Sequence, residues 1–168
     1  MKQPEVRICM DCDQPTLIPV SRDIQIYSSS IRYKCETCEA KIEIQPLASI
    51  GVLITVGLLV LAFWWYILFA RSSDTDIIGT SIYIAAVLAL VCITGIPLLA
   101  HIMNPVAKNP DRELPDLTVN SEHIAKKLIL YLEKFGLLGG LIAPLILLLL
   151  AMGIVFIIGY INYTFFGI

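Results

Sequence analysis

Long uncharged apolar runs alternate with short polar segments along this chain. The apolar runs cover residues 47–70, 77–103 and 136–161, and no Asp, Glu, Lys or Arg lies inside them. Each run exceeds the ~20 residues with which an α-helix crosses a hydrocarbon layer of ~30 Å. A water-soluble domain of this size would have too little polar surface to cover three such helices. The pattern therefore predicts a mainly α membrane protein with three transmembrane helices in these ranges.

Residues 1–46 follow a different pattern, in which short β-branched and aromatic segments are separated by polar residues. Segments 16–20, 24–27, 31–33 and 41–44 are typical of short strands, and residues 21–23 and 28–30 are typical of turns. We therefore expect a small β domain of three or four strands before the first span.

Residues 104–135, between the second and third spans, combine a proline-rich part with an amphipathic helix. Pro105, Pro110 and Pro115 predict an extended chain up to Asn120, and a helix begins near Ser121. The expected apolar face of this helix comprises Ile124, Leu128, Tyr131, Leu132 and Phe135, and the solvated face comprises Lys126, Lys127, Glu133 and Lys134. Such a helix would lie at the membrane interface or dock a partner.

The distribution of charge adds an orientation. The chain has 168 residues, of which 57% are hydrophobic and 15% charged, with a net charge of −2. Of its twelve Lys and Arg residues, six lie in 1–46, one in the 71–76 loop and five in 104–135. By the positive-inside rule, we expect 1–46 and 104–135 in the cytoplasm, and 71–76 and the 162–168 tail outside, in a bacterial inner (plasma) membrane.

Four of the five cysteines form two C-x2-C pairs, Cys9-Met-Asp-Cys12 and Cys35-Glu-Thr-Cys38, with 22 residues between them. Two such turns brought together supply four thiolates for a tetrahedral metal site. About 46 residues can hardly bury a self-sufficient core, so we expect a metal to supply much of the folding free energy.

Zn²⁺ is the expected ion, and iron is the alternative because four thiolates suit both. Two interpretations without a metal remain open. The cysteines could form disulfides, which a reducing cytoplasm disfavours. They could also form a thiol redox pair, although neither C-x2-C pair opens a helix in a βαβ pattern. Cys92 lies alone within the second span, and we assign it no role.

The segments Arg7-Ile-Cys-Met-Asp-Cys12 and Tyr33-Lys-Cys-Glu-Thr-Cys38 resemble the rubredoxin-like zinc-ribbon family over residues 6–44. The resemblance implies one metal ion held by Cys9, Cys12, Cys35 and Cys38. That family usually carries Gly after the second cysteine of each pair, where this chain has Asp13 and Glu39. Acidic residues beside a negatively charged tetrathiolate disfavour an easily reduced iron centre.

A cysteine ribbon followed by membrane spans is also similar to the half-module of the paraquat-inducible protein A family. The similarity lies in Cys9-x2-Cys12-Asp13, in Leu17-Ile18-Pro19 and in a second cysteine pair shortly before a span. It implies a role in a lipid-trafficking membrane assembly. Modules of that family carry four spans, whereas this chain has three.

Other chemistry is not indicated by the sequence. The spans lack the charged residues that mark ion paths, and no nucleotide-binding loop, activated nucleophile or H-E-x-x-H motif is present. We therefore expect no enzyme, and the charge balance predicts no nucleic-acid partner. His101 and His123 are the only histidines, and we expect them to satisfy polar neighbours rather than to ligate haem.

These observations together favour a non-catalytic accessory or assembly subunit of a larger membrane complex. Its expected partners are other integral membrane subunits and the lipid bilayer. The alternatives are a membrane-tethered rubredoxin-type iron electron carrier and a component of a lipid-trafficking assembly.

Overall fold

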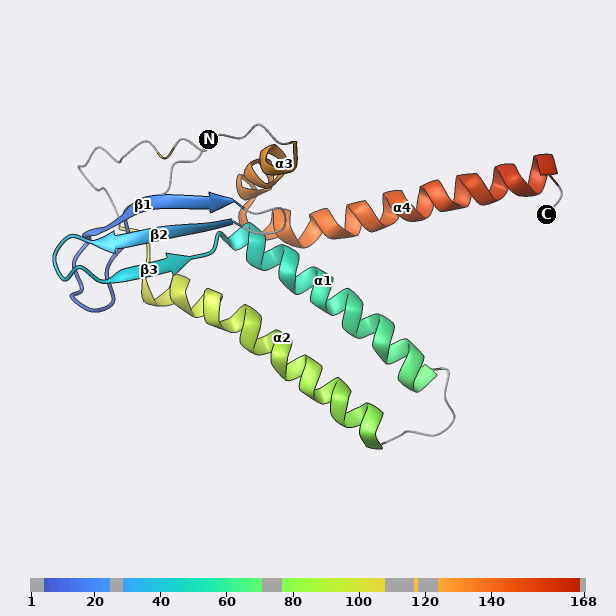
Figure 1. Cartoon of the computed structure of the whole chain (residues 1–168), viewed down its shortest axis with the longest axis horizontal. Coiled ribbons are helices and arrows are strands. Elements are labelled where there is room, and N and C mark those ends of the chain that lie inside the picture. Colours follow the sequence, from blue (N-terminus) through green and yellow to red (C-terminus); the bar gives the residue numbers. More distant parts are fainter. Residues whose placement is uncertain (1–4, 25–28, 71–76, 108–116, 118–123, 167–168) are drawn as a thin grey trace.

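The computed structural model describes residues 5–24, 29–70, 77–107, 117 and 124–166, and it shows a small sheet from which long helices extend (Figure 1). The strands are β1 (Leu17–Ile24), β2 (Ser29–Cys35) and β3 (Lys41–Ile44). The helices are α1 (Leu47–Trp65), its π-helical continuation η1 (Tyr66–Ala70), α2 (Ile77–Met103), α3 (Ile124–Glu133) and α4 (Gly136–Phe166). We call residues 5–46 the head. The mainly helical fold with a small N-terminal sheet is as predicted.

The sheet is antiparallel in the order β1-β2-β3. The predicted turn at 21–23 is wrong, because β1 runs through it with an irregularity between Pro19 and Ser21. The extra residue shifts the alternation of side chains, so Arg22 points to the same face as Pro19. The predicted turn at 28–30 is also wrong where it is described, since Ser29 and Ser30 belong to β2.

Three helical stretches, Leu47–Phe69, Ile77–Met103 and Gly136–Phe165, are long and apolar enough to cross a membrane. They correspond to the three apolar runs of the sequence. Helix α4 continues to Phe166, past the expected end of the third span at residue 161. Nothing in 162–166 breaks a helix, and the Thr164 hydroxyl donates to the Tyr160 carbonyl within it.

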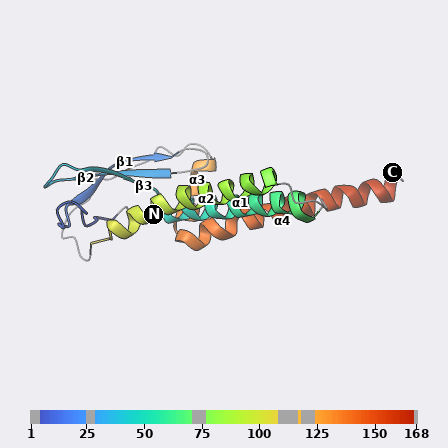
Figure 2. The ribbon, with the colours of Figure 1, turned by 90° about the horizontal axis from the view of Figure 1, so that it is seen from below.

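Helix α1 is central, and α2 and α4 both pack on it. At its crossing with α4 the backbones are in close contact, because a Cβ on Gly140 would overlap the carbonyl oxygen of Ala48. The Thr55 hydroxyl donates to the Leu141 carbonyl at 3.0 Å beside this crossing. Beyond the crossing, α4 diverges from α1 and ends far from the head (Figures 1 and 2).

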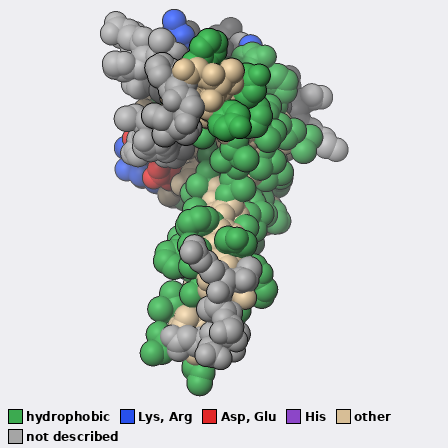
Figure 3. Space-filling view, turned by 90° about the vertical axis from the view of Figure 1, so that its right-hand side faces the viewer, with side chains coloured by type: hydrophobic (Ala, Val, Ile, Leu, Met, Phe, Trp, Pro, Cys, Tyr) green, Lys and Arg blue, Asp and Glu red, His purple; other side chains and the backbone are tan. Residues whose placement is uncertain are grey.

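The apolar surface of the helices is largely unburied. No residue of α2 is buried, and apolar side chains cover the face seen in Figure 3, with charged side chains confined to the head end. In a bilayer such a surface contacts lipid or other helices.

The head is joined to the end of α2 by backbone hydrogen bonds. The Ile8 N–H donates to the Pro105 carbonyl at 2.9 Å, and the Ala107 N–H donates to the Val6 carbonyl at 2.9 Å. Arg7 thereby pairs with Leu17 on one side and with Val106 on the other. The head and the chain that follows α2 consequently lie at the same end of the helices, as the charge distribution predicts.

Candidate metal centre

The four predicted cysteines come together at the end of the head that is remote from α1. Their sulfur atoms all lie within 4.8 Å of one another, and the Cys9–Cys38 and Cys12–Cys35 sulfur pairs are 3.6 Å apart. A tetrahedron with metal–sulfur bonds of ~2.3 Å has edges of about 3.8 Å, whereas a disulfide needs ~2.05 Å. The arrangement therefore fits one metal ion held by four thiolates.

The two cysteine turns have the same backbone hydrogen bonds. In the first, the Cys9 N–H donates to the Gln14 carbonyl, and in the second the Cys35 N–H donates to the Ala40 carbonyl, both at 2.9 Å. The Asp13 N–H returns to the Cys9 carbonyl at 2.8 Å, and Glu39 does the same with Cys35 at 3.1 Å. This repetition points both cysteines of each turn toward a common centre.

The site is buried on one side and open on the other. Cys9 and Cys35 are completely buried in an apolar cluster with Leu17, Tyr33 and Ile44, whereas Cys38 is exposed. A metal bound here would therefore form part of the core of the head.

Hydrogen bonds and mutual repulsion distribute the charge of the cluster unequally. Burial of Cys35 opposes ionisation, but the N–H groups of Cys38 and Thr37 and the Thr16 hydroxyl, 3.2 Å from the sulfur, lower the Cys35 pKa to about 6. For Cys38 the Ala40 N–H favours the thiolate, yet Cys35, burial and the other cysteines raise the pKa to about 12. Burial also raises the pKa of Cys9. A bound cation is what would let all four thiolates coexist.

The first cysteine turn is hydrogen-bonded to Asn104, the residue that follows helix α2. The Met10 N–H donates to the Asn104 side chain at 3.2 Å, and an Arg7 guanidinium nitrogen donates to the Asn104 carbonyl at 2.7 Å. Asn104 is almost fully buried, and the Arg7 guanidinium also lies over the Tyr33 ring. The sequence gives no signal for these contacts, because they join residues nearly a hundred positions apart.

His101 satisfies two polar neighbours rather than pointing into open space. Its Nε2 lies 2.6 Å from the Gln45 carbonyl and therefore carries the proton, so Nδ1 accepts from Arg7 at 3.1 Å. These two contacts join the end of α2 to Gln45 and Arg7 of the head. His123 lies outside the described residues.

A second polar cluster joins the head to α3 and α1. Glu133 accepts from Arg22 of β1 with one carboxylate oxygen and from the Ser29 hydroxyl with the other. The Ser29 N–H in turn donates to the Ser49 hydroxyl of α1 at 3.3 Å. The side chains of Arg22 and Glu133 are only 8% and 15% exposed.

The prediction for one residue of the solvated face of α3 is therefore wrong. Glu133, expected in solvent, is enclosed because it faces Arg22, and Leu130 is buried beside it. Tyr131 and Phe135, expected on the apolar face, are exposed in the isolated chain and contact each other edge to face. The expected start of this helix near Ser121 and the side chains of Ile124 and Leu128 lie outside the described residues.

No protein-family model matches this chain, and neither the curated proteins nor the solved structures contain a match. The resemblances to the rubredoxin-like zinc ribbon and to the paraquat-inducible protein A half-module rest on the two cysteine pairs and on Leu17-Ile18-Pro19. The structure adds to the first of them the clustering of all four cysteines within metal-binding distance.

Proposed function

We propose that this chain is a non-catalytic accessory or assembly subunit of a larger integral membrane complex. The observation that carries the proposal is the unburied apolar surface of the spans. Within α2 no residue is buried, and the most apolar part of α4 is likewise unburied in the described chain. These helices carry no charged group with which to conduct ions, so packing against other helices is the role that their composition supports.

The head suits contact with a cytoplasmic face of the complex. Its position is defined by two polar clusters, one around His101 and Arg7 and one around Glu133 and Arg22. With Zn²⁺ at the four cysteines, it becomes a small rigid module at the end of the spans. The acidic neighbours Asp13 and Glu39 support zinc over a reducible iron.

Purification of the tagged chain from native membranes in a mild detergent tests this function. We expect a stoichiometric integral membrane partner to copurify. A chain that purifies without such a partner would contradict the proposal. A photo-crosslinking amino acid placed at Ile96 or at Val155 should capture that partner, because these positions are 70% and 68% exposed. The same residue at Thr55, buried against α4, is the matched control and should not.

The exposure of Cys38 favours a second candidate, a membrane-tethered iron electron carrier, because an exposed ligand brings a redox partner close to the metal. Metal analysis separates the two candidates. A colourless protein with one zinc per chain eliminates electron transfer, and visible thiolate-to-iron absorption would replace the zinc assignment.

A further inference from the structure

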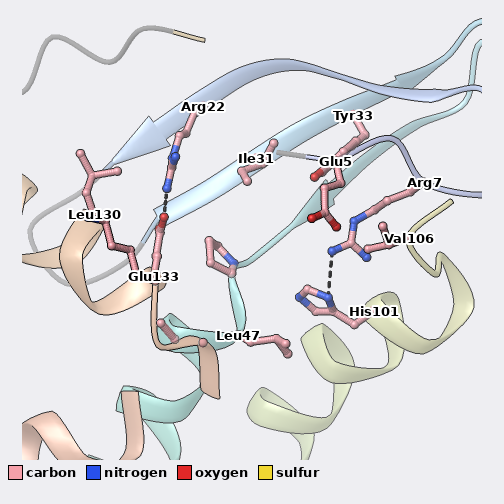
Figure 4. Close-up of a pocket in the computed structure, with 14 residues that line it drawn as sticks. Glu5, Arg7, Arg22, Ile31, Tyr33, Leu47, His101, Val106, Leu130 and Glu133 are labelled. Atoms are coloured by element: carbon pink, nitrogen blue, oxygen red, sulfur yellow. Dashed lines mark hydrogen bonds and ion pairs between the residues drawn. The ribbon is translucent and has the colours of Figure 1, made fainter. Parts of the chain in front are cut away.

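A cavity of about 250 Å³ lies between the head and the ends of the helices (Figure 4). Its walls come from β1 and β2, from the chain before β1, and from α1, α2 and the α3–α4 junction. Leu47 and Gly136 are the first residues of the first and third spans, and His101 lies in the last turn of the second span. The cavity is therefore at the depth where the apolar spans meet the polar head.

The walls combine an excess of cationic groups with apolar side chains. Arg7, Arg22 and Lys134 line the cavity together with two carboxylates, Glu5 and Glu133. Both oxygens of Glu133 already accept hydrogen bonds, from Arg22 and Ser29. The three cations and two carboxylates give the lining a net positive charge.

Two residues that line this cavity each carry a donor that lacks an acceptor. The Nε atoms of Arg7 and Arg22 are buried, and neither has a hydrogen-bond partner among the described residues. The Arg22 side chain is 8% exposed, and its burial lowers the guanidinium pKa. A buried N–H without an acceptor costs free energy, which a ligand rich in acceptor oxygens recovers.

We propose that this cavity binds the phosphate group of a membrane phospholipid. A phosphate offers several anionic oxygens to the guanidinium forks of Arg7 and Arg22. Helix α1 begins at the same cavity with no side-chain cap on its first turn, which also favours an anion. Leu47, Val106 and Leu130 form apolar walls beside the charged groups, as the glycerol and upper acyl chains of a lipid require.

We assign the phosphate to a lipid headgroup rather than to a free ion because the cavity lies at the ends of the spans, where headgroups are located. The inference shares with the proposed function only the placement of the three helices in a bilayer. Sedimentation of the chain with alkali-washed membranes checks this shared premise separately.

Two substitutions test the site without removing the charge of either partner in its ion pair. Arg22→Lys keeps a cation for Glu133 but removes the Nε donor and the planar fork. Lys134→Gln removes one cation from an exposed position on the rim. Lys127→Gln removes the same charge from an exposed position of α3 that does not line the cavity, and it is the matched control.

The full chain in a neutral detergent is titrated with dioctanoyl phosphatidylglycerol, dioctanoylglycerol or inorganic phosphate, and binding is read by native mass spectrometry. We expect saturable 1:1 binding of the phospholipid, none of the diacylglycerol, and competition by inorganic phosphate only at far higher concentration. Arg22→Lys and Lys134→Gln should each weaken phospholipid binding by about fivefold or more, and Lys127→Gln should leave it unchanged.

Three results would overturn the proposal. Equal binding of dioctanoylglycerol would show an apolar surface alone, and equal loss in Lys127→Gln would show diffuse charge. Inorganic phosphate that binds as tightly as the phospholipid would identify a free anion as the ligand. If Arg22→Lys loses the fold of the head, measured by hydrogen exchange of β2, the comparison of Lys134→Gln with Lys127→Gln decides. A chain that binds phospholipid but purifies without a partner rejects the accessory role and retains this site.

Discussion

Asp13 and Glu39 occupy equivalent positions in the two cysteine turns and share a left-handed backbone, with φ of 52° and 59°. In each turn this conformation lets the N–H return to the carbonyl of the first cysteine. Glycine adopts it without a steric penalty, and aspartate tolerates it better than glutamate does. The left-handed backbone therefore explains why rubredoxin-like ribbons usually have glycine at this position. This chain forms the same turn with Asp13 and Glu39, whose side chains make this conformation strained.

Replacing Glu39 by Gly should stabilise the head by about 1 kcal/mol, because the strain in φ disappears. Asp13→Gly should have a smaller effect. Hydrogen exchange of the β2 amides measures both, with about fivefold slower exchange expected for Glu39→Gly. Glu39→Ala is the control, since it removes the charge but retains the strain. Equally slow exchange in Glu39→Ala would assign the effect to charge.

Cys12→Ser should unfold the head without preventing membrane insertion, because the metal supplies much of the folding free energy of the head. Limited trypsin digestion reads the result at Arg22, Arg32 and Lys41, which the folded sheet protects. Cys92→Ser, in α2 and away from the cluster, should keep full resistance. A resistant head in Cys12→Ser would contradict a structural metal.

Acidification from pH 7.5 to 5.5 should release the metal to a chelator. The folded Cys35 pKa of about 6 lies below its usual value, so the stability that this thiolate contributes is lost as the pH falls through 6. Thr16→Val removes a donor to the Cys35 sulfur and should move the midpoint of release to higher pH. Thr16→Ser retains the hydroxyl and should restore the midpoint. Identical midpoints in the two variants would exclude this hydrogen bond as a cause.

Gly140→Ala should separate α4 from α1, because its Cβ would overlap the Ala48 carbonyl. A loss of about 1–3 kcal/mol is expected from such overpacking. The midpoint of thermal unfolding in detergent measures the loss. Gly153→Ala, in the same helix with nothing within 4 Å of the added Cβ, is the matched control and should not lower the midpoint. Equal midpoints for the two variants would argue against close contact of these backbones.

Glu133→Leu should destabilise docking of the head by about 3 kcal/mol, because it leaves the enclosed Arg22 cation without its carboxylate. The double variant Arg22→Met with Glu133→Leu should recover most of this loss, since no unpaired charge remains. Hydrogen exchange of β1 in the single and double variants provides the measurement. Additive losses would mean that the two residues act independently.

Much of the architecture follows from local patterns in the sequence. The runs beginning at Leu47, Ile77 and Gly136 mark the helices because no charged residue interrupts them. Pro97 and Pro144 lie inside α2 and α4 without ending them. The cysteine spacing marks the metal cluster because a C-x2-C turn needs only neighbouring residues to orient its sulfurs.

The parts that the sequence does not reveal depend on contacts between distant segments. Arg22 reads as a turn residue because it lies among Ser21 and Asp23, and only the irregularity before Ser21 turns it inward. Glu133 reads as a solvated residue because its partner is on another element. Periodicity sorts the residues of α3 by hydrophobicity alone and therefore misses this ion pair.

The pairing of Val6 with Ala107 and of Ile8 with Pro105 has a consequence for the order of biosynthesis. The first segment of the head emerges from the ribosome early, but its partner strand is made only after two apolar helices have been translated. The sheet can form beforehand, whereas its edge at Arg7 stays open until the second helix and the residues after it have been made. Closure of that edge therefore waits until the whole hairpin of α1 and α2 has been made.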